Sequence, residues 1–167
     1  MTGLSEQHRR QYAEEGYTVP DFTLPPTTLA TLRAALSRVL HSNPTIRSDS
    51  DLVNAHLRLG QRGAKIDGDP AFLELGRDPA LTALLAALHA PAAGELSPWA
   101  AGVVLWGVHV FCKQPGADVA AGRRVPFHVD GTYWPIEPLA AATIWVALDS
   151  ADTESGCALP RPHTQPT

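Results

Sequence analysis

The stretch Pro126-Phe-His-Val-Asp-Gly-Thr-Tyr-Trp-Pro135 decides how the chain is interpreted, because it places His128 two residues before Asp130. In a β-strand, residues i and i+2 project from the same face. An imidazole and a carboxylate at one strand end supply two of the three protein ligands of a non-haem Fe(II) site and leave positions open for oxygen chemistry. The triplet alone also fits an ordinary hydrogen-bonded pair, so the rest of the sequence has to decide.

Composition places limits on the class of protein. The chain has 167 residues, 44% of them hydrophobic, and a formal charge of -4, which predicts a single globular domain with a small-molecule substrate rather than a partner for nucleic acid or anionic membranes. Two cysteines and an N-terminus without the apolar core of a secretion signal favour a reducing cytoplasm. No apolar run approaches the roughly 20 residues that span a membrane.

Residues 1–97 are predicted to be mainly helical. Ser5 is a plausible N-cap, and Gly16 a helix stop. From Thr27 to His41 apolar residues recur at helical spacing, so one helix face should pack against a large apolar surface, for which a sheet is the natural candidate. These residues are Leu29, Leu32, Leu36, Val39 and Leu40.

Two Asp-Pro pairs predict further helix starts. Asp69-Pro70 and Asp78-Pro79 each resemble an N-cap followed by proline at the first helical position, with helices that end near Leu75 and His89. The polar segment 43–69 lacks periodicity. Its basic residues fit either a solvated loop or a lid that recognises an anionic substrate. They are Arg47, Arg58, Arg62 and Lys65.

Residues 98–159 change in character and are predicted to form strands. Gly102–Cys112 and Ala140–Leu148 are both rich in β-branched and aromatic residues. Two-residue alternation separates each run into two faces. In the first run, Val108, Val110 and Cys112 should oppose His109, Phe111 and Lys113; in the second, Thr143, Trp145 and Ala147 should oppose Ile144, Val146 and Leu148, which would pack against helices. Helices followed by strands indicate an α+β fold.

These motifs together resemble those of the phytanoyl-CoA dioxygenase family. The matching features are His-x-Asp followed by Tyr133-Trp-Pro-x-x-Pro138, the strand Thr143-x-Trp-x-Ala-Leu-Asp149 and Glu154-Ser-Gly-Cys157. The resemblance implies an Fe(II)- and 2-oxoglutarate-dependent oxygenase that consumes molecular oxygen. It also implies that the N-terminal helices pack on a partial double-stranded β-helix, a jelly-roll or cupin-like arrangement within one domain spanning residues 1–167.

The resemblance also implies roles for single residues. His128 and Asp130 would be iron ligands, and retention of the Asp130 carboxylate favours hydroxylation over halogenation. Lys113 and Trp145 would contact 2-oxoglutarate. Tyr133 and Trp134 would line the substrate entrance.

Structural alternatives exist for several of these residues. Lys113 also fits a solvated charge at a loop edge. Trp145 and Trp134 also fit core packing, which is the commoner use of large aromatic side chains. Cys157 has no neighbouring base in the sequence that would activate a thiol, so no chemistry is assigned to it.

The sequence departs from the family pattern near its end. The family supplies its distal iron histidine and a 2-oxoglutarate-binding arginine beyond the Gly-Cys segment, and His163 is not in the setting of that ligand. We therefore expect a C-terminally incomplete domain, of which the chain is an inactive fragment or a shortened form. Two other functions stay open: a cupin-like metalloprotein that does not use 2-oxoglutarate, and a non-catalytic or vestigial binding protein.

Overall fold

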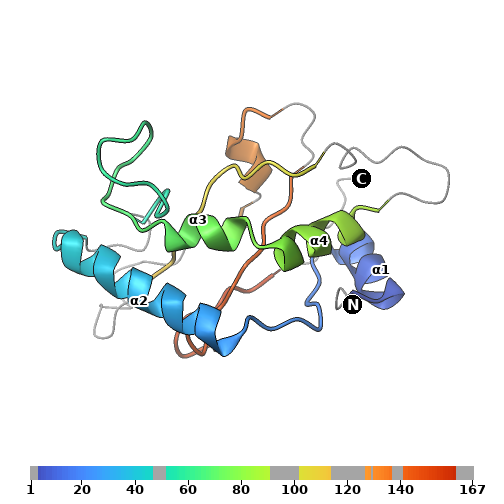
Figure 1. The fold of residues 1–167 in the computed structure, drawn as a ribbon. Helices are drawn as coiled ribbons and strands as arrows, with labels where there is room; N and C mark the ends of the chain where they lie inside the picture. Colours follow the sequence, from blue (N-terminus) through green and yellow to red (C-terminus); the bar gives the residue numbers. More distant parts are fainter. Residues whose placement is uncertain are drawn as a thin grey trace.

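A computed structural model describes residues 4–46, 52–90, 102–113, 127–128, 130–136 and 141–160. In these parts the regular elements are α1 (Glu6–Glu15), α2 (Pro26–Ser42), α3 (Ala71–Gly76), α4 (Pro79–Leu88) and a 3₁₀ helix, η3 (Asp130–Tyr133). Helix α3 lies above α2, α4 follows α3 toward the right of the view, and α1 lies beside the end of α4 (Figure 1). An edge-to-face contact between Tyr12 and His89, with ring centroids 5.5 Å apart, joins α1 to the end of α4.

Helix α1 begins and ends where the sequence predicts. The Ser5 side chain accepts from the His8 backbone N–H, and the His8 ring accepts from the Ser5 backbone N–H, so the two residues form a reciprocal cap. Gly16 closes the helix in the left-handed conformation at φ 80°. Both boundary predictions are confirmed.

Helix α2 supplies more buried core residues than any other helix of the described residues. Its span, Pro26–Ser42, extends the predicted helix by one residue at each end, and Leu32, Ala35 and Val39 are its buried residues. The predicted apolar face is confirmed, with Leu36 and Leu40 packed at its margins. Among the described residues its partner is not a sheet, which corrects the prediction. The surface opposite α2 consists of non-helical residues and the first turn of α3, namely Leu52, Ala55, Ile66, Phe72 and Val110.

The segment 52–69 is tightly hydrogen-bonded where its two ends meet, whereas residues 58–63 between them are exposed, as the prediction of a solvated loop requires. Asp69 N–H donates to Ala55 O at 2.7 Å, and Gly68 N–H donates to Leu57 O at 2.7 Å. The amide of Asn43, just after α2, bonds both to the Asp67 carbonyl at 3.0 Å and to the Asp67 N–H at 3.0 Å. These bonds satisfy buried backbone groups that a loop otherwise exposes to water.

The two Asp-Pro helix starts have different outcomes. At α4 the prediction is confirmed. The Asp78 carboxylate accepts a hydrogen bond from the Ala80 N–H at 2.7 Å, and Pro79 stands in the first turn. At α3 the helix begins one residue later than predicted, at Ala71, although the Asp69 carboxylate still accepts from Ala71 N–H at 3.0 Å. The predicted ends near Leu75 and His89 agree with the structure within one residue.

The expected partial double-stranded β-helix is wrong for the part of the chain that the structure describes. Residues 102–112 and 141–148 form no regular strand there, and the β-type pairing consists of one antiparallel bridge, Val53 to His109. Two backbone bonds flank it, from Ala55 N–H to Val108 O and from Val110 N–H to Leu52 O. The physical reason is that strand propensity reflects packing against neighbouring strands, so residues with strand composition need a ladder of partners to form a sheet.

The predicted alternation within residues 108–113 is nevertheless confirmed. Val110 is buried, and Val108 and Cys112 pack against the core beneath it, whereas Phe111 is 57% exposed and His109 and Lys113 face outward. One side of this extended segment therefore packs on α2 as a strand would. Among the described residues, no helix is both long and apolar enough to cross a membrane.

Candidate functional site

His128 and Asp130 converge, although not from a strand. Asp130 opens η3, so the expected strand setting is wrong for the carboxylate. Its Oδ1 lies 3.2 Å from His128 Nε2, and the two side chains are 39% (His128) and 43% (Asp130) exposed. The pair is thus accessible from solvent, with one imidazole nitrogen and one carboxylate oxygen facing each other.

Thr143 fixes the second oxygen of the carboxylate. Its hydroxyl donates to Asp130 Oδ2 at 2.9 Å and connects η3 to the extended segment 141–148. Oδ2 is therefore engaged, and Oδ1 is the oxygen directed at His128. Metal-binding carboxylates are commonly held in this way by an outer hydrogen bond.

The separation of the two facing atoms is compatible with a shared metal ion. Two donors at right angles, each about 2.1 Å from one divalent ion, lie roughly 3 Å apart. The observed 3.2 Å fits that spacing, and it also fits a direct N–H···O contact. Across the described ranges, no group of three or more His, Cys, Asp or Glu side chains gathers as a metal centre. The residues therefore fit as one part of an iron site, with two donors.

Lys113 is anchored to the turn that follows residue 150. Its ammonium group donates to the carbonyl of Gly156. Asp152 organises this turn by accepting from the backbone N–H groups of Glu154 at 3.0 Å and Ser155 at 2.7 Å. The backbone hydrogen bond from Ser155, followed by its hydroxyl, lowers the pKa of the Asp152 carboxyl below its ordinary value.

Comparison with protein families gives a match over nearly the whole chain. The model of the phytanoyl-CoA dioxygenase family matches residues 12–166. The chain belongs to this family. Searches of curated proteins and of solved structures gave no match.

Membership of the phytanoyl-CoA dioxygenase family makes the chain dioxygenase-like in general and confirms the family resemblance of its motifs. The matched range includes His128, Asp130, Lys113 and Trp145.

The aromatic residues of this dioxygenase-family chain occupy exposed or partly exposed positions. Trp145 is 50% exposed, so the alternative that it packs in the core is wrong. Trp134 is half-buried directly after η3, where its backbone N–H donates to the carbonyl oxygen of Gly131 at 3.3 Å. Tyr133 ends η3, and its side chain lies outside the described residues. Ile144 is 38% exposed, while Leu148 packs against the core and Val146 is half-buried, so the predicted packing of that face is only partly confirmed.

Sequence reasoning missed the contribution of Thr143. Its partner, Asp130, is 13 residues away, and no helical or strand spacing relates the two positions. The strand motif of the family contains this threonine, but the motif gives it no role. His163, for which no ligand role is predicted, lies outside the described residues.

Proposed function

We propose that the chain acts as an Fe(II)- and 2-oxoglutarate-dependent oxygenase that hydroxylates a small metabolite, with His128 and Asp130 as two of the iron ligands. The observation that supports this most strongly is the 3.2 Å separation of His128 Nε2 and Asp130 Oδ1 within a chain of the phytanoyl-CoA dioxygenase family. Iron, once bound with 2-oxoglutarate and molecular oxygen, supplies the oxidising chemistry that protein side chains lack.

The protein residues have positioning tasks in this proposal. His128 would present Nε2 to the metal, and Asp130 would present Oδ1 because Thr143 holds Oδ2. Holding the carboxylate in one orientation lowers the reorganisation that metal binding requires. The hydroxyl of Thr143 is therefore proposed as a positioning group rather than a ligand.

Lys113 and Trp145 are proposed to contact 2-oxoglutarate. Lys113 bonds to a neutral carbonyl, that of Gly156, which a carboxylate can replace as a stronger, charge-assisted partner. Trp145 lies two residues beyond Thr143 and is half exposed, so its ring is accessible to a ligand. Tyr133 and Trp134, which end and follow η3, are proposed to line the substrate entrance.

Metal-dependent stability tests the ligand assignment. A ligand that binds only the folded state raises its stability according to the ratio of ligand concentration to dissociation constant. Mn(II), an air-stable substitute for Fe(II), should therefore raise the Tm of the wild type. The double variant His128→Ala/Asp130→Ala should lose this increase.

A matched control removes the same residue types elsewhere. His41 and Asp21 are both exposed, so His41→Ala/Asp21→Ala deletes one imidazole and one carboxylate away from the pair. The control should retain the Mn(II)-dependent increase in Tm. An equal increase in both double variants would show that His128 and Asp130 form only a hydrogen-bonded pair, as in the non-catalytic alternative.

The cupin-like alternative differs in its cosubstrate. A metalloprotein that does not use 2-oxoglutarate binds metal at the same pair but is indifferent to that acid. Titrating 2-oxoglutarate into the Mn(II) form should raise the Tm further only if the proposed function is right. Succinate, which lacks the 2-oxo group needed for chelation, is the matched control ligand.

A further inference from the structure

The turn formed by residues 152–157 lies against Lys113, the residue proposed to contact 2-oxoglutarate. The Lys113 ammonium group donates to the carbonyl of Gly156. The Lys113 side chain also packs on this glycine, because a Cβ at Gly156 would lie 2.8 Å from its Nζ and 2.9 Å from its Cδ. The 152–157 turn therefore engages both the charge of Lys113 and the outer part of its stem.

The 152–157 turn keeps its shape through its own hydrogen bonds. The Asp152 carboxylate accepts from the backbone N–H groups of Glu154 and Ser155, and from the Ser155 hydroxyl at 2.9 Å. The Cys157 N–H donates to the Asp152 carbonyl at 2.8 Å. Apart from Cys157, which is half-buried, the residues of the turn are exposed. A segment with so few buried contacts can leave Lys113 at little cost to the rest of the fold.

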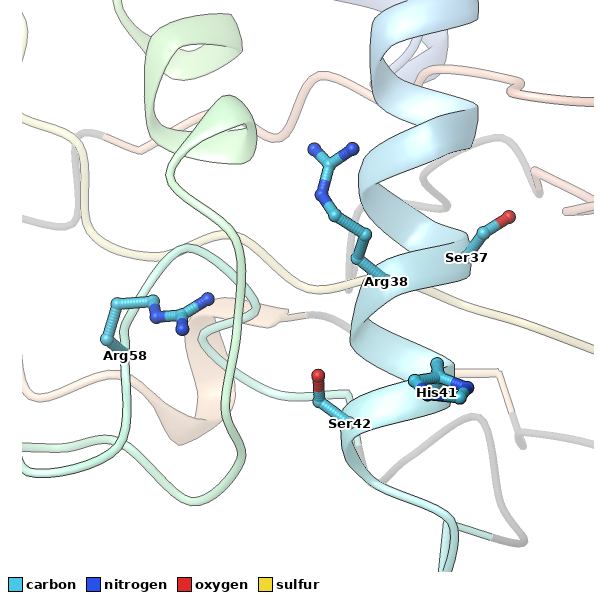
Figure 2. Close-up of a pocket in the computed structure, with 5 residues that line it drawn as sticks. All are labelled: Ser37, Arg38, His41, Ser42 and Arg58. Atoms are coloured by element: carbon cyan, nitrogen blue, oxygen red, sulfur yellow. The ribbon is translucent and has the colours of Figure 1, made fainter.

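The partner of Lys113 is neutral, whereas the arginines on α2 and on the loop before α3 have charged partners. Arg38 and Arg58, on the two sides of the groove between these elements (Figure 2), lie 2.8 Å and 3.1 Å from the carboxylates of Asp69 and Asp67. Hydrogen bonds between two charged groups are stronger than those to a neutral carbonyl. An anionic ligand therefore displaces less at Lys113 than at either arginine.

The 152–157 turn and a dicarboxylate ligand also oppose each other through charge. Asp152 and Glu154 place two carboxylates within four residues of Gly156, and 2-oxoglutarate carries two more. Like charges at close range disfavour a state in which the turn and the ligand are both at Lys113. A ligand that needs a minor state of the protein binds with an affinity reduced by the population of that state.

We propose that the 152–157 turn is an autoinhibitory contact that occupies Lys113 in the empty protein and is displaced when a carboxylate of 2-oxoglutarate binds there. This inference rests on the proposed function and adds a coupling to it. Because coupling between two sites is reciprocal, loosening the turn raises the affinity for 2-oxoglutarate, and binding of 2-oxoglutarate releases the turn.

Calorimetric titration of the Mn(II) form with 2-oxoglutarate, at low ionic strength, tests the effect of the turn on affinity. Asp152→Ala removes the side-chain hydrogen bonds of the turn. Glu154→Ala is the matched control, because it removes one carboxylate from the same turn, and that carboxylate makes no hydrogen bond or ion pair with the described residues. Asp152→Ala should bind 2-oxoglutarate at least about threefold more tightly than Glu154→Ala. In a Lys113→Met background, which lacks the ammonium group, Asp152→Ala should give no gain.

Cleavage of the wild type by a Glu-specific protease tests the effect of the ligand on the turn. Cleavage after Glu154 should be about threefold faster with Mn(II) and 2-oxoglutarate than with Mn(II) and succinate, because cleavage follows the population of the released turn. Cleavage after Glu74 of α3 should not accelerate, since the release is local.

Two results would overturn the inference and leave the proposed function standing. One is equal affinity for 2-oxoglutarate in Asp152→Ala and Glu154→Ala. The other is a rate of cleavage after Glu154 that does not rise when 2-oxoglutarate binds. A wild type whose Mn(II) form binds no 2-oxoglutarate would contradict the proposed function itself, and the inference with it.

Discussion

At the scale of single residues, the hydrogen bond from Thr143 fixes the orientation of the Asp130 carboxylate, which an ordinary exposed carboxylate lacks. The Thr143 hydroxyl lies 2.9 Å from Oδ2, on the side of the carboxylate that does not face His128. A fixed carboxylate presents one oxygen to a metal, whereas a freely rotating one must be ordered when the metal binds.

We therefore expect Thr143→Ala to weaken Mn(II) binding by about tenfold, the lower end of the effect of losing an outer hydrogen bond. Thr143→Ser keeps the hydroxyl and should stay near the wild-type affinity. Calorimetric titration with Mn(II) measures both. Unchanged affinity in Thr143→Ala would mean that the hydroxyl does not orient a metal ligand.

His56 gives a prediction for the pH dependence of stability. Burial, followed by the charge of nearby His109, lowers the pKa of His56 below 6.5. The unfolded chain thus takes up a proton at a pH where the folded chain does not, which favours unfolding in acid. The free energy of unfolding therefore decreases as the pH falls through 6.5, where His56 of the unfolded chain takes up its proton. This decrease levels off below the pKa of His56 in the folded chain.

Replacing His56 by glutamine removes this titration. The free energy of unfolding should then depend less on pH between about pH 8 and about pH 5. His41→Gln makes the same change at an exposed position of α2 and serves as the control. Urea unfolding at several pH values measures the slope, and equal slopes in His56→Gln and the wild type would contradict the account.

At the scale of elements, Asp69 joins α2 to α3. It accepts from Arg38 of α2 and caps Ala71 at the start of α3. Asp69→Ala removes both bonds and should destabilise the fold by about 2 kcal/mol, through loss of a cap and of a charge-assisted hydrogen bond.

Asp78→Ala at the start of α4 is the matched comparison for Asp69→Ala. It removes an exposed cap alone and should cost about 1 kcal/mol. Chemical denaturation measures both variants. A smaller loss for Asp69→Ala than for Asp78→Ala would show that the Arg38 contact adds nothing to the stability of the helix pair.

Substitution of Gly68 tests whether the two ends of the 52–69 loop are fixed by close approach of their backbones. A Cβ at this position would lie 2.2 Å from the carbonyl oxygen of Ala55, and backbone atoms cannot move aside as a flexible side chain can. Gly68→Ala should therefore destabilise the fold by more than about 3 kcal/mol, in the range of severe core changes.

Gly60→Ala is the control for Gly68→Ala, because it introduces backbone strain without a steric clash. Gly60 has φ +92° and no atom within 4 Å of the added Cβ, so its substitution should cost only about 1 kcal/mol. Thermal unfolding measures both variants. A Gly68→Ala protein as stable as Gly60→Ala would contradict the close packing of the loop.

The elements that the sequence predicts well are those decided by neighbours in the chain. The caps at Ser5, Gly16 and Asp78, and the apolar face of α2, depend on residues within one or two helical turns, and they were predicted nearly to the residue. The prediction of a sheet as the partner of α2 was wrong, because a polar segment without periodicity gave no sign that Leu52 and Ala55 would be buried.

The strand predictions show where local information ends. Residues 108–113 alternate between inward and outward side chains as predicted, so the extended conformation is decided locally. A sheet, however, depends on partners distant in sequence, and alternation does not specify them. The same limit applies to the site: His128 and Asp130 approach each other, but Asp130 does so from a 3₁₀ helix and not from the strand on which their spacing was interpreted, and the contact of Thr143 could be found only in three dimensions.

At the scale of the whole molecule, the extended segments leave large apolar side chains in contact with water. These are Val104 at 91%, Trp106 at 59%, Phe111 at 57% and Phe127 at 58% exposure. Exposed apolar groups of this size, on segments that form no regular strand within the described residues, favour association with other molecules.

We expect the chain to associate with itself as its concentration rises. Sedimentation velocity over a range of concentrations should show an increase in mean mass, and Val104→Lys/Phe111→Lys should reduce it. Val19→Lys is the control, because Val19 is 74% exposed but lies in the link between α1 and α2. A wild type that stays monomeric at every concentration would contradict this expectation.

The central claim is that His128 and Asp130 bind iron together with 2-oxoglutarate, and anaerobic absorption spectroscopy tests it most directly. Fe(II) and 2-oxoglutarate added together should produce a visible metal-to-ligand charge-transfer band that neither gives alone. The band should be absent in His128→Ala/Asp130→Ala and present in His41→Ala/Asp21→Ala. A wild type without the band, or a band of equal intensity in both double variants, would contradict the claim.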